Sequence, residues 1–419
     1  MSAIVLLDLA LNLVSDIIRM YDLSGLFSFV IICMLVSGIG LVILLYINSE
    51  TTKITQDSVK LRKFGKIFLC NQVLLIALLT WLILQIVLYS YYNSLLIRVI
   101  LTDSMGMGCL LMGFLAFKFF SWYNSNRKFL LLSYAVGSTA WCGGIMISIL
   151  FFQSVLFTMP IDRDAFSDAS YPELGEKTTQ KALNNGYTIS NISIFIIFWL
   201  SSVILLYHHA RRIGIVKFWI IISLPLISFL SIFMVSDQLV QSATDLGLDL
   251  MYVYIIGYGV PNLITGVLLF VPFWIISNNI QNKTVRSFML LVAFGFLIST
   301  LSLTVTIYNE PYPPLGLPSI TIIGLSIYMI FIGIYYSVIS VTGDTLLRQT
   351  IRKSLLEESK LLGELSLANA SNELTARVID ISKKFKEDMQ AKTGVETSLS
   401  DSDMKHYLDE IMNEMYSQK

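Results

Sequence analysis

Charged residues are scarce in this chain, and that shortage is the first constraint on its fold. Of the 419 residues only 14% are Asp, Glu, Lys or Arg, whereas 55% are hydrophobic. A water-soluble domain carries roughly a quarter charged residues, so this chain lacks the polar surface that a soluble fold of its length needs. The formal net charge is zero, which gives no reason to expect a nucleic-acid partner.

Catalytic and metal-binding patterns are missing from the sequence as well. The three His and four Cys residues form no Cys/His cluster and no HExxH motif, and the sequence contains no phosphate-binding loop. His208 and His209 are adjacent, so on a helix they project about 100° apart and do not share a face as metal ligands at i and i+4 do. We therefore expect no catalytic residue, no metal and no cofactor, and a protein that is not an enzyme.

Long apolar runs are what the chain has in abundance. A helix needs about 20 apolar residues to cross a bilayer, and runs of this length and uniformity exclude barrel strands. The expected fold is therefore all-α: a polytopic helical membrane protein with about nine transmembrane helices and a cytoplasmic C-terminal helical tail. The nine predicted spans are 26–47, 67–89, 99–120, 129–153, 188–207, 215–235, 251–276, 287–308 and 319–341.

The Lys and Arg residues predict the orientation of these spans. Loops that alternate along the chain, at 48–66, 118–128, 208–217 and 277–287, hold 13 of them; the segments on the opposite side hold 5, and the tail holds 11. Because basic loops stay in the cytoplasm, we expect a multi-pass protein of the cell membrane. Its C-terminus would then be cytoplasmic and its N-terminus outside.

The predicted topology divides the chain into three segments: an N-terminal segment at 1–25, a transmembrane helical bundle at 26–341 and a cytoplasmic helical tail at 342–419. The first segment is apolar, but several polar residues fall on one helical stripe. This favours an amphipathic helix lying in the outer interface of the lipid bilayer, with a tenth span as the alternative. The stripe consists of Asp8, Asn12, Ser15, Asp16 and Arg19.

Small residues on the third and fourth spans predict close helix packing, because small side chains let two backbones approach. The spacing of these residues places them on one stripe of each span, so we expect the two spans to form a tight hairpin. The stripes are Gly106, Cys109, Gly113 and Ala116 on the third span and Gly137, Ala140, Gly144 and Ser148 on the fourth.

Polar and ionisable groups inside the membrane are candidates for a ligand site. Asp103 lies near the outer end of the third span, and Asn262 follows Pro261 in the seventh. Pro261 removes a backbone donor, and an Asn beside the freed carbonyl is a place where a solute or ion binds. The alternative is structural, since Asn commonly bonds between helices and Pro commonly kinks them.

The sequence of the C-terminal tail predicts helices whose apolar faces pack against a partner surface. Residues 344–390 are charged and favour a helix, with an irregular apolar seam that includes Leu362 and Leu365. Ser400 and Asp403 then form a capping box at the start of a second, amphipathic helix. The partner is the preceding helix, a second copy of the chain or another protein.

A many-span membrane module that continues into a cytoplasmic helix resembles the sensor modules of prokaryotic membrane histidine kinases. His406 stands in the sequence DMKHYLDE, which differs from the family's phosphoacceptor motif of His, an acid, Leu, Arg, any residue and Pro. The resemblance therefore implies a sensor without its kinase domain.

Three hypotheses about function remain open. The chain is a receptor-like module that passes a signal to the tail, a transporter or channel for a small solute or ion, or an accessory subunit of a larger membrane complex. The helical tail favours the first and the third. An odd number of spans without a visible inverted repeat weakens the second.

Overall fold

The computed structural model describes most of the apolar part of the chain, and its elements are all helices. The described residues are 4, 23–54, 59–89, 93–125, 127–156, 178–207, 215–234, 260–280, 282–304, 314, 316–343, 365–366 and 368–369. The helices are α2 (Leu23–Ile54), α3 (Val59–Tyr89), α4 (Ser94–Ser125), α5 (Phe129–Leu156), α7 (Thr178–Tyr207), α9 (Ile215–Met234), α12 (Val260–Asn279), α13 (Lys283–Thr304), α14 (Leu317–Thr321) and α15 (Ile323–Gly343).

Seven of these helical segments are long and apolar enough to cross a membrane. They lie in α2, α3, α4, α5, α7 and α13, and in α14 and α15 taken together. The described parts of α9 and α12 hold shorter apolar stretches, Phe218–Ile227 and Ile264–Asn278. The helical membrane fold is thus confirmed, whereas the sixth and seventh of the nine spans stay predictions.

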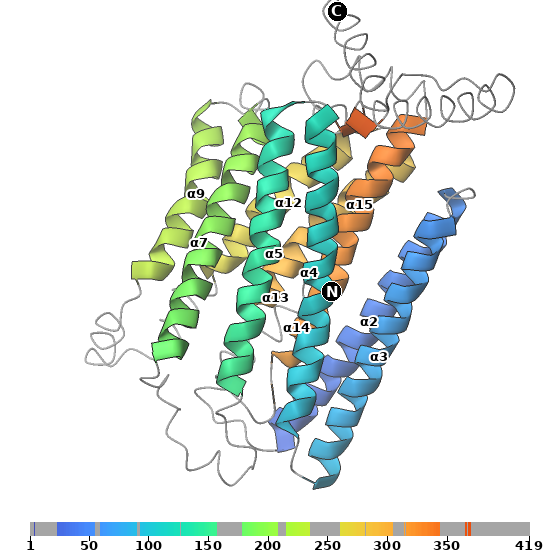
Figure 1. The fold of residues 1–419 in the computed structure, drawn as a ribbon, viewed down its shortest axis with the longest axis vertical. Helices are drawn as coiled ribbons and strands as arrows, with labels where there is room; N and C mark the ends of the chain where they lie inside the picture. The colour runs from blue at the N-terminus through green and yellow to red at the C-terminus, as the bar shows by residue number, and fades with distance from the viewer. Residues whose placement is uncertain are drawn as a thin grey trace, which may run out of the picture.

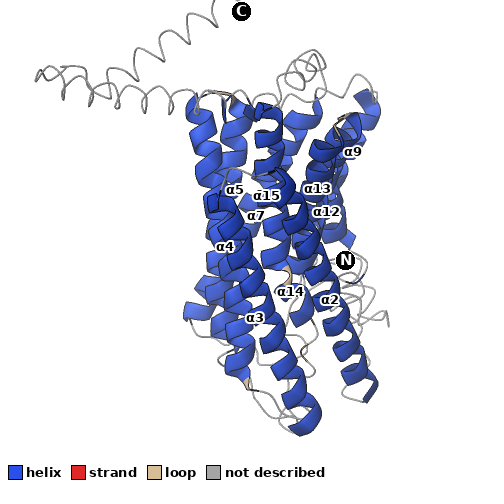
Figure 2. Ribbon diagram, turned by 90° about the vertical axis from the view of Figure 1, so that its right-hand side faces the viewer, coloured by secondary structure: helices blue, strands red, loops and turns tan. Residues whose placement is uncertain are grey.

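The helices run side by side along the long axis of the molecule, and consecutive ones, with α14 and α15 taken together, point in opposite directions (Figures 1 and 2). Short connections favour such antiparallel neighbours. The closest pairs along the chain are α4 with α5, α12 with α13 and α5 with α7, while α13 packs against α15. The α2–α3 hairpin stands at one side of the bundle (Figure 1).

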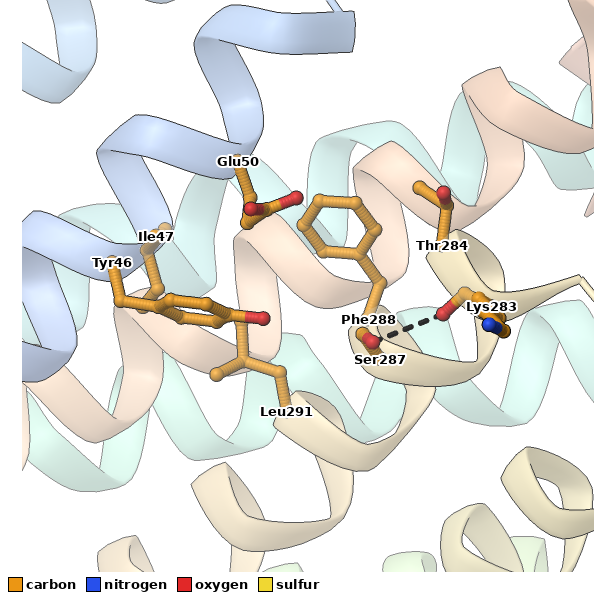
Figure 3. A pocket seen from close by; sticks show the side chains of 8 residues that line it. All are labelled: Tyr46, Ile47, Glu50, Lys283, Thr284, Ser287, Phe288 and Leu291. Carbon is orange, nitrogen blue, oxygen red and sulfur yellow. Dashed lines mark hydrogen bonds between the residues drawn. The ribbon is translucent and has the colours of Figure 1, made fainter.

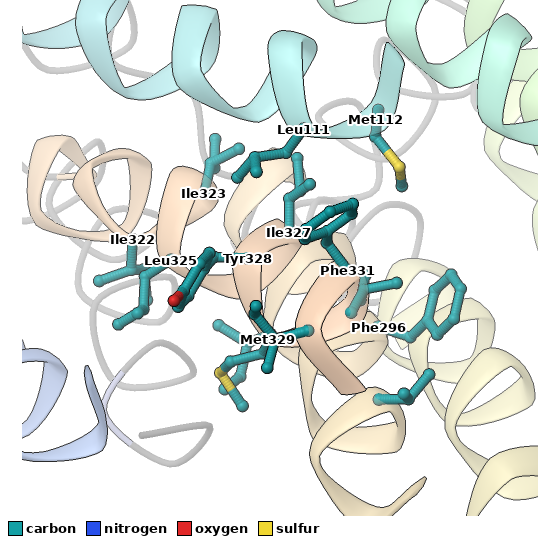
Figure 4. Packing of buried hydrophobic residues seen from close by; sticks show 14 of the residues in the cluster. Leu111, Met112, Phe296, Ile322, Ile323, Leu325, Ile327, Tyr328, Met329 and Phe331 are labelled. Carbon is teal, nitrogen blue, oxygen red and sulfur yellow. The ribbon is translucent and has the colours of Figure 1, made fainter. Parts of the chain in front are cut away.

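The last apolar segment lies in the middle of the described bundle. Of the residues in the apolar stretch of Leu317–Ser340, 89% are buried inside the protein, compared with 33% for the span in α2 and 28% for that in α3. A helix that is apolar all round is suited to such a position. Figure 4 shows Ile327, Tyr328 and Phe331 of α15 among side chains of α4 and α13, such as Leu111 and Phe296.

A short break precedes this central helix. Gly316 has φ 89° and stands at the N-terminal cap of α14, with Pro318 in the first turn. The left-handed backbone at Gly316 suits glycine, which lacks a Cβ. The Ser104 hydroxyl of α4 donates to the carbonyl of Ile320 over 2.7 Å. A hydroxyl group of α4 therefore bonds the backbone of α14 two residues before Ile322, the C-terminal cap of α14.

Two glycines let α13 and α15 approach each other closely. A Cβ on Gly333 of α15 would lie 2.7 Å from the backbone carbonyl oxygen of Phe288, and one on Gly295 of α13 would lie 2.8 Å from that of Ser326. On the other side of α15, a Cβ on Gly324 would lie 3.1 Å from the carbonyl oxygen of Ser104 in α4. The central helix is therefore held at backbone distance by two neighbours.

The predicted hairpin of the third and fourth spans is confirmed, but one of its two stripes packs elsewhere. α4 and α5 are in extensive contact, and the Sγ atoms of Cys109 and Cys142 lie 3.1 Å apart between them. Gly137 and Gly144, however, face Phe198 and Ile194 of α7. Because both faces of α5 are covered, sequence spacing alone did not show which neighbour each stripe serves.

We expect Gly333→Ala to destabilise the protein by about 1–3 kcal/mol, the usual cost of overpacking a core. The added methyl group would meet backbone rather than a mobile side chain. The measurement is thermal unfolding of the detergent-solubilised protein. Gly38→Ala is the matched control, because a Cβ there meets nothing within 4 Å and alanine favours a helix. Equal melting temperatures for the two variants would contradict the close approach.

Candidate functional site

Asp103, a residue singled out from the sequence, pairs with an amide from the neighbouring helix. The Asn71 Nδ2 of α3 donates to Asp103 Oδ2 of α4 over 3.0 Å. Both residues lie within candidate spans, and the Asp103 side chain is only half-buried. An ionisable group at membrane depth is expensive unless it has a partner, so Asn71 supplies a donor that offsets part of this cost.

Other polar contacts join the same stretch of α4 to two further neighbours. The Gln153 Nε2 of α5 donates to the Thr102 hydroxyl over 2.6 Å and to the backbone carbonyl of Arg98 over 3.1 Å. Ser104 reaches Ile320 as described above. The segment around Asp103 is thus bonded to α3, α5 and α14. Chemically, such a carboxylate can exchange a proton or pair with a cation.

Asn262 and Pro261 lie in the first described turn of α12, but their side chains are outside what the structure describes. α12 packs against α13, α9 and α7, whereas the partner of Asp103 is on α3. The structure therefore gives no contact that joins the three residues. A ligand site at Asn262, Pro261 and Asp103 stays a prediction.

A second polar contact, which sequence reasoning missed, lies at the far end of α4. The Trp122 Nε1 donates to the Asn369 Oδ1 over 3.3 Å, although the two residues are 247 positions apart. Leu365 and Ala368 are each only 1% exposed and belong to the main hydrophobic core, and Ser366 is buried with them. The described part of the tail is thus docked on the transmembrane bundle.

α4 also contacts the central helix close to this docked segment. The Lys118 Nζ lies 5.7 Å from the centre of the Tyr335 ring of α15, a cation–π contact. Phe119 packs edge-on against Trp122, with ring centres 5.5 Å apart. One end of α4 therefore meets both α15 and the tail. No pattern in the sequence pointed to this arrangement, because the contacts join residues far apart in the chain.

Within the part of the chain that the structure describes, no group of three or more His, Cys, Asp or Glu residues could hold a metal ion. Cys109 and Cys142 are close, but each thiol also bonds the other residue's backbone carbonyl, at 3.5 and 3.4 Å. They link α4 to α5 as small, partly buried side chains do.

The fold and these contacts define the class: this chain is a multi-pass helical membrane protein. Comparison with known proteins takes the identification no further, because no family model, no curated protein and no solved structure matches it.

The Asn71–Asp103 bond can be tested with a double-mutant cycle. We expect Asn71→Ala and Asp103→Ala to be non-additive, with a coupling free energy of about 0.5–1.5 kcal/mol, the range found for hydrogen bonds between membrane helices. The free energy of unfolding would be measured in mixed micelles. Pairing Asn71→Ala with Ser193→Ala is the control, because the Ser193 hydroxyl bonds Ile189 in its own helix α7. Additivity in both cycles would refute the bond.

Proposed function

We propose that this protein is a membrane-embedded sensor module that passes a change in its bundle to the C-terminal tail. The observation that carries the proposal is the burial of Leu365 and Ala368 in the main hydrophobic core, together with the hydrogen bond from Trp122 of α4 to Asn369. Burying a leucine stabilises an interface by roughly 1.5–3 kcal/mol. Two states separated by a few kcal/mol are what a switch requires, so the docked tail suits an element that is released or retained.

A path of contacts supports the proposal. Asp103 lies in the first third of α4 and Trp122 near its C-terminal end, about 28 Å apart at 1.5 Å per residue. Between them α4 touches α14 through Ser104 and α15 through Lys118. A movement of α4 relative to α3 or α15 therefore bears directly on the tail.

The alternatives predict different behaviour. A transporter or channel needs a path across the membrane, and the middle of the described bundle is filled by the buried helix α15. An accessory subunit also needs a docked tail, but it does not need Asp103 and the tail to be coupled. A docked tail that responds to a change at Asp103 is therefore the behaviour expected of a sensor. The layout, which resembles histidine-kinase sensor modules, is in line with this proposal. The receiver would be a second copy of the chain or a partner protein bound through the tail.

Docking of the tail can be tested with a single reporter thiol, introduced by Ser366→Cys in a background without the four native cysteines. Ser366 is 2% exposed, so we expect slow labelling by a water-soluble maleimide in this reporter protein. Leu365→Asp should raise the labelling rate about tenfold or more, since the buried leucine no longer docks.

Trp122→Phe should also raise the rate, because it removes the indole donor to Asn369. Trp141→Phe is its matched control, since Trp141 is buried in α5 and packs on Phe198.

Asp103→Asn tests whether a change in the bundle reaches the tail. A change in the labelling rate of the reporter thiol supports a sensor, provided that Thr80→Val leaves the rate unchanged. Thr80 is exposed on α3, and its hydroxyl bonds Ile76 of the same helix. Fast labelling in the unmutated reporter protein would refute docking, and an inert Asp103→Asn would favour the accessory subunit.

We also propose the orientation derived from the basic loops. Because successive helices alternate in direction, the helix ends that flank the four basic loops share one end of the bundle (Figure 1). The exposed side chains of Lys66, Arg127, Lys128 and Lys283 belong to these ends. Basic residues favour the cytoplasm. The C-terminus is then cytoplasmic and the N-terminus outside the cell membrane.

Labelling of single cysteines in intact cells tests both orientation and span number. Cysteines introduced by Ser170→Cys and Ser242→Cys should react with a membrane-impermeant maleimide, and one introduced by Ser402→Cys should react only after the cells are opened. Positions 170 and 242 flank the fifth and sixth predicted spans, so they share a side only if both spans cross or neither does. Labelling at position 402 in intact cells would reverse the orientation, and protection at position 242 alone would remove the sixth span.

A further inference from the structure

A cleft of about 130 Å³ lies between α2 and α13 (Figure 3). Its two walls carry opposite charges, Glu50 on α2 and Lys283 on α13. The candidate span in α2 ends at Thr52 and that in α13 begins at Lys283, so the charged rim lies where apolar spans give way to headgroups.

The deeper part of the cleft is apolar. Ile47 and Phe288 are 1% and 4% exposed, and Leu291 lies one helical turn beyond Ser287, on the side of the membrane interior. The Tyr46 ring forms part of the α2 wall (Figure 3). The cleft is thus polar at the membrane surface and apolar below it, as an amphiphile is.

The N-terminus of α13 is not the anion-binding element here. The Asn282 Oδ1 accepts from the backbone N–H of Thr284 over 2.9 Å and of Val285 over 3.3 Å. An anion in the cleft would therefore meet side chains, namely the Lys283 ammonium and the Thr284 hydroxyl. The Ser287 hydroxyl donates to the Lys283 carbonyl over 2.9 Å, which fixes that wall.

We propose that this cleft binds a phospholipid of the phosphatidylethanolamine type. Lys283 binds the phosphate, Glu50 accepts hydrogen bonds from the primary ammonium group, and the chain next to the glycerol runs past Phe288 and Leu291. One negative and one positive wall match a headgroup that carries both charges and no net charge. A choline headgroup has no N–H to donate to Glu50, so the carboxylate distinguishes the two lipids. The proposal is independent of the sensor function.

The test is native mass spectrometry of the detergent-solubilised full chain with equimolar phosphatidylethanolamine, phosphatidylcholine and phosphatidylglycerol. We expect phosphatidylethanolamine to be retained best. Glu50→Gln should lower its retention about threefold to tenfold, to the level of phosphatidylcholine, as expected for the loss of a charge-assisted hydrogen bond. Lys283→Gln should lower the retention of all three lipids.

Arg286→Gln is the matched control, because it removes a positive charge from the same helix end but does not line the cleft; its Nη2 bonds Asn278. The amount of phosphatidylethanolamine that this variant retains should stay within about twofold of the parent, a difference in binding free energy of less than 1 kcal/mol. Thermal unfolding confirms that each variant is folded. Equal retention of the three lipids, an equal loss in Arg286→Gln, or displacement by water-soluble phosphoethanolamine would each overturn the proposal.

Discussion

Inside a bilayer, every backbone polar group must be bonded within the protein, because no water is there to bond it. A second constraint in this chain is close helix packing, because the last apolar segment is covered by protein on nearly every side. α15 approaches α13 so closely that a methyl group at Gly333 or Gly295 would press on a carbonyl oxygen, and α4 comes nearly as close at Gly324. The rest of the described bundle is arranged around this contact.

The polar groups are distributed in keeping with that core. Ser104 bonds the carbonyl of Ile320, two residues before the C-terminal cap of α14 at Ile322, and Asn71 bonds Asp103 on the neighbouring face of α4. α4 is therefore the helix that combines intramembrane polar contacts, packing against α15 and a contact with the tail. A helix with three such roles is suited to carry a change from one end of the membrane to the other, which is the basis of the proposed sensor function.

The α2–α3 hairpin has a different character. Only about a third of the residues in its spans are buried, and it meets the central helix through a stack of Phe68 on Tyr328, with ring centres 4.1 Å apart. The Tyr328 hydroxyl also reaches the Asn48 Oδ1 of α2, at 3.4 Å. The centre of the Phe64 ring of α3 also lies 5.9 Å from that of the Phe331 ring of α15. The proposed lipid-binding cleft lies elsewhere, between α2 and α13. A lipid there would complete the packing between α2 and α13.

The sequence by itself determined the class of fold. Apolar runs of about 20 residues and a shortage of charge leave helices as the only way to satisfy the backbone in lipid, and seven of the predicted spans are confirmed. Asp103 was also singled out from the sequence, because an acid at membrane depth is conspicuous, and its place in a ligand site stays a prediction. Only the tertiary structure decided that the last span is central, that Gly137 and Gly144 face α7, that Leu365 is buried in the core, and that Trp122 bonds Asn369. Hydropathy records how far each residue avoids water, and in a membrane both lipid and protein satisfy that requirement equally well. Which apolar faces meet each other is therefore settled by shape and by contacts between residues that lie far apart in the chain.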